Sequence, residues 1–154
     1  MKVTMVIPSY WRRKKTEKRK ETDSVYDHPT PLDGKDTLSR ALESVSILKN
    51  KDFNLVILGV STAQEIQEKV ESRLSSIVKK SAPGVEVLFF SYSHLKQILE
   101  NLTQNKKEEF IPLLQLDGYS NIRNLCLFSA HLLGSETAVL IDDDEIFEDP
   151  LFME

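Results

Sequence analysis

The feature that most constrains the fold is an almost continuously apolar run at residues 53–60, FNLVILGV. A strand that is apolar on both faces is typical of the interior of a parallel sheet, because helices cover both of its sides. Similar runs occupy residues 2–10, KVTMVIPSY, and residues 137–141, TAVLI. Since Pro8 cannot donate a hydrogen bond to a neighbouring strand, we expect the first strand to stop there.

Segments with helical spacing separate these strands. Apolar residues recur every three or four positions across residues 36–49, which predicts an amphipathic helix. A second helix should begin at Thr62, which stands at capping-box spacing from Glu65, and end before Pro83 and Gly84. Its apolar face would consist of Ile66, Val70, Leu74, Ile77 and Val78.

The rest of the chain continues the alternation. Residues 85–90, VEVLFF, predict another strand, and residues 94–102 have weak helical spacing. Residues 106–116 mix charged and apolar side chains around a proline and receive no assignment. The last helix should use Ser120 as its N-cap and stop at Gly134, which suits the left-handed position after a helix.

Strands that alternate with helices predict an α/β fold. We expect a Rossmann-like open, mostly parallel sheet with helices on both faces and right-handed crossovers. A length of 154 residues predicts one domain. The 20 Lys and Arg against 24 Asp and Glu give a formal charge of -4, so no nonspecific nucleic-acid binding is expected.

The single cysteine and the N-terminal residues bear on cysteine chemistry and on the cellular compartment. The lone Cys126 cannot close an intramolecular disulfide, and it stands among apolar residues, so we expect a buried, inert thiol. The N-terminus has no long apolar stretch of the kind found in secretory signals, so the expected compartment is the cytoplasm. None of the three histidines has metal-ligand spacing, and none is assigned a role.

A basic loop is expected at residues 11–35. Residues 12–20, RRKKTEKRK, carry seven basic side chains in nine positions and no apolar one, so we expect none of them in the core. The loop could fold over a diphosphate, contact an anionic acceptor or dock on the inner face of a membrane. The simplest alternative is a solvated loop without a ligand.

The last predicted strand runs into four acids, Asp142, Asp143, Asp144 and Glu145. A divalent cation would relieve the repulsion among them, and oxygen ligands favour Mg²⁺ or Mn²⁺. In an extended backbone Asp142 and Asp144 would share one cation, while Asp143 would point the other way in a supporting role. The alternative is a solvated strand end beside a helix N-terminus.

Four segments in order make the chain resemble the family 2 nucleotide-sugar glycosyltransferases, which have the GT-A fold. These segments are VTMVIPSYWRR, LSRALESV, GYSNIRN and AVLIDDDE. The resemblance covers residues 1–154 as the nucleotide-sugar-binding half of such a domain, apparently truncated before the acceptor half. In that case the donor would bind Pro8, Ser9, Tyr10, Arg123, Asp142 and Asp143, and the metal would bind Asp142 and Asp144.

The resemblance implies a function as well as a site. It implies metal-dependent, inverting transfer of a sugar from a nucleotide diphosphate to a glycan, lipid or small-molecule acceptor. The family's general base lies beyond the acidic strand, so no catalytic residue is assigned. One departure is that Leu58 and Gly59 replace the family's pair of aspartates, although Ser61 and Thr62 remain. This puts uridine specificity in doubt.

Two other functions fit parts of the sequence. A non-catalytic module that binds nucleotide or nucleotide-sugar would need the same donor site. A phosphoryl-transfer domain with an acidic metal pocket would explain the aspartates but leave GYSNIRN and IPSY without a role. A missing acceptor half would also expose apolar surface, so self-association into a homo-oligomer is a further expectation.

Overall fold

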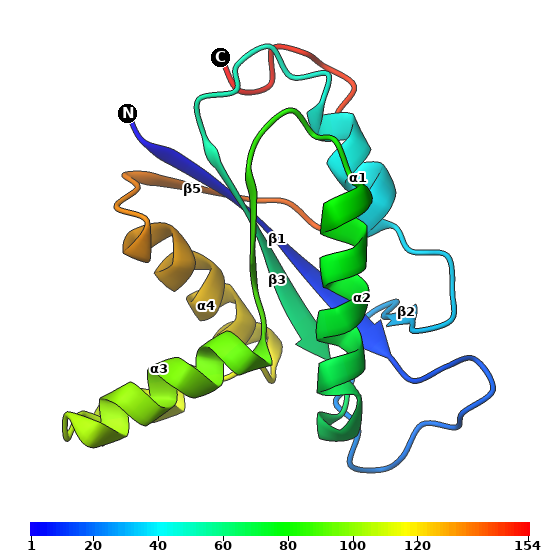
Figure 1. Ribbon diagram of the computed structural model, residues 1–154, viewed down its shortest axis with the longest axis vertical. Coiled ribbons are helices and arrows are strands. Elements are labelled where there is room, and N and C mark those ends of the chain that lie inside the picture. Colours follow the sequence, from blue (N-terminus) through cyan, green and yellow to red (C-terminus); the bar gives the residue numbers. More distant parts are fainter.

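The computed structural model describes all residues, 1–154, and contains a five-stranded parallel sheet (Figure 1). The strands are β1 (Val3–Arg12), β2 (Thr30–Pro31), β3 (Asn54–Ser61), β4 (Val87–Phe90) and β5 (Thr137–Leu140). Their order is β2-β1-β3-β4, and β5 also pairs with β1. Every pairing is parallel, which confirms the predicted open parallel sheet.

Helices cover both faces of this sheet. They are α1 (Leu38–Val45), α2 (Gln67–Lys80), α3 (Tyr92–Gln104) and α4 (Tyr119–Leu132), with short 3₁₀ helices η1 (Gln64–Ile66) and η2 (Glu108–Leu113). Met5 and Ile7 of β1 pack with α1 and α2, whereas Val6 packs with α3 and α4. This alternation along β1 divides the interior into two apolar cores, one on each face. None of the helices combines the length and the apolar character needed to cross a membrane.

The first strand does not stop at Pro8, as the sequence had suggested, but continues to Arg12. Even-numbered residues of β1 turn their backbone groups toward β5 and β2, since Ile141 N donates to Val6 O and Leu32 N to Arg12 O. β5 pairs only with residues 3–6 of β1, and β2 only with residues 11 and 12. Pro8 therefore faces an opening in the sheet where no strand needs its missing N–H.

Two predicted helix caps are also wrong. Thr62 continues the β3 ladder, because its N donates to Trp11 O at 2.8 Å, and α2 begins only after η1. Ser120 lies inside the first turn of α4, whose N-cap is Gly118 with a φ of 77°. In both places the backbone that precedes the helix is held by other contacts, so the side-chain cap has no role.

The bounds of the helices also differ from those predicted. α1 ends at Val45, and Ser46 to Leu48 form tight turns rather than a further helical turn. The weak pattern at residues 94–102 corresponds to α3, and part of the unassigned segment 106–116 forms η2. Cys126 is fully buried, as expected, and burial raises the pKa of its thiol to about 12.

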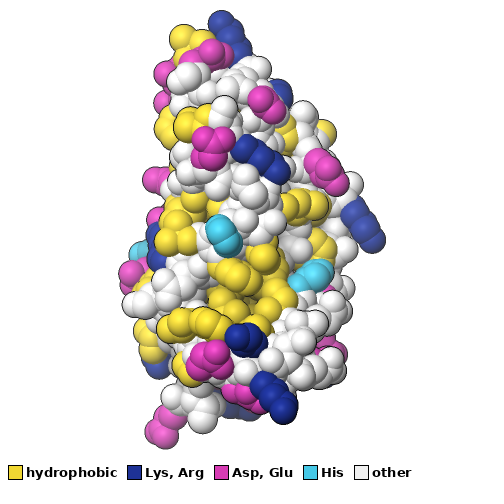
Figure 2. Space-filling model, turned by 90° about the vertical axis from the view of Figure 1, so that its left-hand side faces the viewer, with side chains coloured by type: hydrophobic (Ala, Val, Ile, Leu, Met, Phe, Trp, Pro, Cys, Tyr) yellow, Lys and Arg dark blue, Asp and Glu magenta, His cyan; other side chains and the backbone are white.

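Apolar side chains gather in the middle of the face shown in Figure 2. A groove of about 450 Å³ lies along α3, and its walls are formed by Phe90, His94, Gln97, Ile98, Asn101 and Leu102. Leu127 on α4 is 53% exposed. Self-association through such a surface stays a prediction.

Gly59 on β3 lies directly against Leu74 of α2. A Cβ at this position would collide with Cδ1 of Leu74, and Leu58 beside it is fully buried. We therefore expect Gly59→Ala to lower the free energy of unfolding by about 1–3 kcal/mol through overpacking. Urea denaturation measures the change. In a Leu74→Ala background the same substitution should cost much less, and an equal cost in both backgrounds would contradict the contact.

Candidate functional site

The opening between β5 and β2 leads into a cleft of about 350 Å³. It lies at the carboxyl ends of β1 and β5, where open α/β sheets bind their ligands. Ten side chains line it: Pro8, Tyr10, Asp27, His28, Thr37, Tyr119, Arg123, Asp142, Asp143 and Asp144. Of the site residues predicted from the sequence, the cleft therefore gathers all but Ser9.

The acidic segment reaches the cleft as a turn and not as an extended strand. β5 ends at Leu140, and Glu145 N donates to Asp142 O at 3.1 Å. The Glu145 carboxylate in turn accepts from Asp142 N at 3.1 Å. The prediction that these acids lie on an extended backbone, with side chains that alternate between two sides, is therefore wrong. All three aspartates line the cleft, with Asp142 and Asp144 exposed and Asp143 half-buried.

Asp143 is anchored from below by β1. Its Oδ2 accepts a 2.5 Å hydrogen bond from Ser9 Oγ, which itself accepts one from Trp11 Nε1 at 2.9 Å. Burial raises the pKa of Asp143 to about 6, against the opposing effect of hydrogen bonds from Ser9 and Thr37. Ser9 is fully buried because it points to the opposite side of β1 from Pro8 and Tyr10. It supports the acidic turn and does not line the cleft.

Arg123 projects from the first turns of α4 toward the acids. Its Nη2 donates to Asp142 Oδ1 at 3.0 Å, and the two side chains are 42% and 54% exposed. An ion pair this exposed contributes little free energy. Little free energy is therefore lost if the pair separates. The guanidinium could then bind an anion and the carboxylate a cation.

Three tyrosines, Tyr10, Tyr26 and Tyr119, pack together in an aromatic wall beside the cleft. The ring centroids of Tyr10 lie 4.8 Å from Tyr26 and 5.7 Å from Tyr119, and those of Tyr26 and Tyr119 lie 5.3 Å apart. The Tyr10 hydroxyl is buried without a hydrogen-bond partner. Burial raises the pKa of Tyr10 well above its usual value, so the phenol stays neutral. Tyr10 was expected to bind the donor and Tyr119 stands in the GYSNIRN segment, but no sequence pattern had indicated Tyr26.

The second half of the basic loop is tied to the start of α4. Asp117 Oδ1 accepts hydrogen bonds from Ser24 Oγ at 2.5 Å and from Tyr26 Oη at 3.2 Å. Gly118 N donates to Tyr26 Oη at 3.1 Å, and Asp27 N donates to Tyr119 Oη at 2.6 Å. These contacts place Asp27 and His28 in the cleft wall, where no sequence pattern had indicated them.

Removing the carboxylate at Asp117 should release this wall. In Asp117→Ala we expect faster hydrogen exchange at residues 24–28, by about tenfold, because each lost hydrogen bond stabilises the closed loop by about 1 kcal/mol. Exchange followed by mass spectrometry measures it. Asp52→Ala, which removes an exposed carboxylate with no such role, is the control. Unchanged exchange in Asp117→Ala would contradict the tether.

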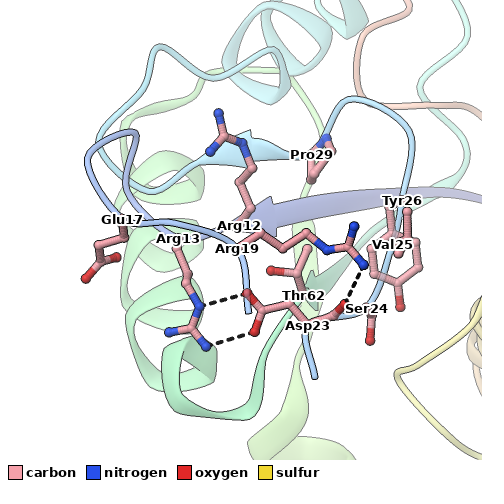
Figure 3. A pocket seen from close by; sticks show the side chains of 10 residues that line it. All are labelled: Arg12, Arg13, Glu17, Arg19, Asp23, Ser24, Val25, Tyr26, Pro29 and Thr62. Carbon is pink, nitrogen blue, oxygen red and sulfur yellow. Dashed lines mark hydrogen bonds and ion pairs between the residues drawn. The ribbon is translucent and has the colours of Figure 1, made fainter. Parts of the chain in front are cut away.

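The first half of the loop contains a buried ion pair, contrary to the expectation that none of its basic residues enters the interior. Arg13, only 8% exposed, donates to both oxygens of Asp23 at 2.8 and 2.9 Å (Figure 3). Arg13 Nη2 also reaches Glu65 at 2.9 Å, and Lys20 pairs with Glu65 at 2.8 Å. The guanidinium is buried because carboxylates compensate it, which composition alone does not reveal.

The donor chemistry of the cleft fits a divalent cation only in part. No group of three or more His, Cys, Asp or Glu side chains is arranged to hold a metal ion. Asp142 and Asp144 offer two exposed carboxylates, and Mg²⁺ commonly binds through one or two carboxylates together with phosphate oxygens. These two carboxylates alone would leave most of the coordination shell of such a cation to other ligands.

Comparisons with protein-family models, with curated proteins and with solved structures found no match to this chain. By its fold and its site, the protein is an α/β domain with a cleft at the carboxyl edge of its sheet. Acidic and aromatic side chains line this cleft.

Proposed function

We propose that the cleft binds the diphosphate of a nucleotide-sugar together with Mn²⁺ or Mg²⁺, and that the chain takes part in transferring the sugar to an acceptor. One observation carries the proposal: Arg123, Asp142 and Asp144 converge on one cleft at the carboxyl ends of β1 and β5. A guanidinium and two exposed carboxylates suit a ligand that brings both phosphate oxygens and a cation.

Each residue has a distinct part in this proposal. Asp142 and Asp144 hold the cation, while Asp143 keeps the turn in position through its hydrogen bond from Ser9. Arg123 releases Asp142 and donates to a phosphate oxygen. The bound cation would neutralise negative charge that develops on the leaving diphosphate. Pro8 and Tyr10 face the nucleoside.

The order of motifs supports the same conclusion. From the resemblance to GT-A glycosyltransferases we expect Arg123 to approach the diphosphate and the acidic run to bind the metal. Although these residues are separated by up to 136 positions from Pro8, they line one cleft with it. The solvated strand end, the simplest alternative, gives no reason for this convergence.

Recognition of the nucleobase differs from that expected of the family. Leu58 is buried and Gly59 lies under Leu74, so β3 offers no carboxylate that could read a base. The available contacts are the rings of Tyr10 and Tyr119, which line the cleft, and stacking on aromatic rings tolerates any base. We therefore expect uridine and guanosine diphosphates to bind with affinities within about tenfold of each other.

Thermal unfolding with a panel of UDP, GDP, CDP and ADP, each with and without Mn²⁺, tests the binding step. At a ligand concentration of 100 times Kd, binding contributes about 2.7 kcal/mol, which should raise Tm by roughly 5–10 °C. The increase should require Mn²⁺. Release of UDP or GDP from the corresponding sugar nucleotide tests transfer, and binding without any release would favour the non-catalytic module.

A further inference from the structure

A second pocket, drawn in Figure 3, borders the same loop segment that walls the cleft. Tyr26 and Pro29 line this pocket, whereas the intervening Asp27 and His28 line the cleft. Its volume is about 190 Å³, below the range of about 300–1,000 Å³ that is usual for whole drug-sized ligands. A small polar group fits such a volume better than a nucleotide does.

The positive charge of this pocket is not fully compensated within the protein. Arg13 is paired with Asp23 and Glu65, but no ion pair of the structure involves Arg12 or Arg19. Arg19 makes only a 3.4 Å contact with the backbone oxygen of Asp23. Figure 3 shows the Arg12 guanidinium extending away from the Arg13 and Asp23 pair, whereas the Arg19 guanidinium lies beside Val25 with a dashed line to the backbone oxygen of Asp23. Two guanidinium groups thus line the pocket without a carboxylate partner.

A buried hydroxyl group in the pocket also lacks a partner. Thr62 is 5% exposed, and its Oγ1 makes no hydrogen bond. Its backbone is fully engaged, since Thr62 N donates to Trp11 O and Thr62 O accepts from Ser24 N. A buried hydroxyl without a partner is costly, and an anionic oxygen is the acceptor that would relieve it best.

We propose that Arg12, Arg19 and Thr62 form a binding pocket for a phosphoryl group, separate from the cleft. Arginine favours phosphate because its planar fork donates two parallel hydrogen bonds to the oxygens. Asp23 does not oppose the anion, because Arg13 already compensates its charge. Glu17 is the one acid of the pocket without an arginine partner. The phosphoryl group can belong to a soluble phosphate monoester or to a lipid headgroup.

Titration of the ¹⁵N-labelled chain with inorganic phosphate, at constant ionic strength and without divalent metal, tests the pocket. We expect chemical-shift changes confined to residues 12–13, 19, 23–26 and 62. Arg12→Gln and Arg19→Gln should each weaken binding by about tenfold, since each removes a charge-assisted hydrogen bond. Thr62→Val should weaken it without disturbing the sheet. Arg40→Gln, an exposed arginine on α1, is the control and should bind as the unmodified chain does.

The two sources of the phosphoryl group are then separated. Glycerol 3-phosphate and vesicles that contain phosphatidic acid are compared, and preference for either supports the pocket and names its source. Shift changes at residues 12, 19 and 62 report on this pocket, whereas changes at residues 119–123 and 142–144 report on the cleft, so failure of the cleft proposal is distinguishable from failure of this one. Equal effects of chloride and phosphate, or unchanged binding by Arg12→Gln and Arg19→Gln, would overturn the proposal.

Discussion

Asp142→Asn and Asp144→Asn should each abolish the part of nucleotide binding that depends on Mn²⁺. Both carboxylates are exposed in the cleft, whereas Asp143 is held by a hydrogen bond from Ser9. Loss of one of two protein ligands should weaken binding of UDP with Mn²⁺ by at least about tenfold, the scale of one charge-assisted contact. Calorimetric titration measures it.

The controls for this prediction lie within the same segment. Glu148→Gln removes a neighbouring exposed acid that does not line the cleft, and its binding should match that of the unmodified chain. Tm should be almost unchanged in Asp142→Asn, because the pair with Arg123 is exposed and contributes little. If Glu148→Gln lost binding as strongly as Asp144→Asn, general electrostatic attraction would explain the effect and the assigned ligands would be wrong.

Asp23→Asn should destabilise the fold more than any substitution in the cleft. It leaves the buried Arg13 guanidinium facing a neutral amide, with only the exposed Glu65 carboxylate as a charged partner. Breaking a buried ion pair by removing one partner is strongly destabilising, and we expect Tm to fall by about 10 °C. Asp33→Asn, on an exposed acid of the same loop, should change Tm by no more than about 2 °C.

The pH dependence gives this prediction a second readout. Hydrogen bonds from Arg13 lower the pKa of Asp23, so its carboxylate stabilises the folded state above its usual titration range. That contribution is lost as the pH falls toward the depressed pKa. The difference in Tm between the unmodified chain and Asp23→Asn should be full above about pH 5 and shrink below about pH 4. A difference independent of pH would show that charge is not the cause.

The sequence predicts the sheet well because its signal is local. Residues 53–60 are apolar on both faces, and amphipathic segments flank them. This combination predicts a central strand of a parallel sheet. The end of β1 could not be predicted, because whether Pro8 interrupts a strand depends on its neighbours across the sheet. β5 and β2 leave a gap beside Pro8, and their positions are set by contacts far along the chain.

The candidate site divides in the same way. Tyr10, Arg123 and the three aspartates stand in recognisable segments, so they could be chosen before the structure was known. Asp27 and His28 carry no local signal and enter the cleft through the tether between Tyr26 and Asp117, whereas Thr37 reaches it from the N-cap of α1. Ser9 was assigned to the nucleoside pocket on its position in the motif, but strand alternation turns it toward Asp143 instead.

The central claim is that the cleft binds a diphosphate through a divalent cation. The most direct measurement is calorimetric titration of uridine, UMP and UDP into the purified chain, each with and without Mn²⁺, repeated with guanosine, GMP and GDP. We expect Mn²⁺ to strengthen binding of the diphosphates by more than about tenfold and to leave the nucleosides unaffected. Diphosphate binding that does not respond to Mn²⁺, or no binding of any of these ligands, would contradict the claim.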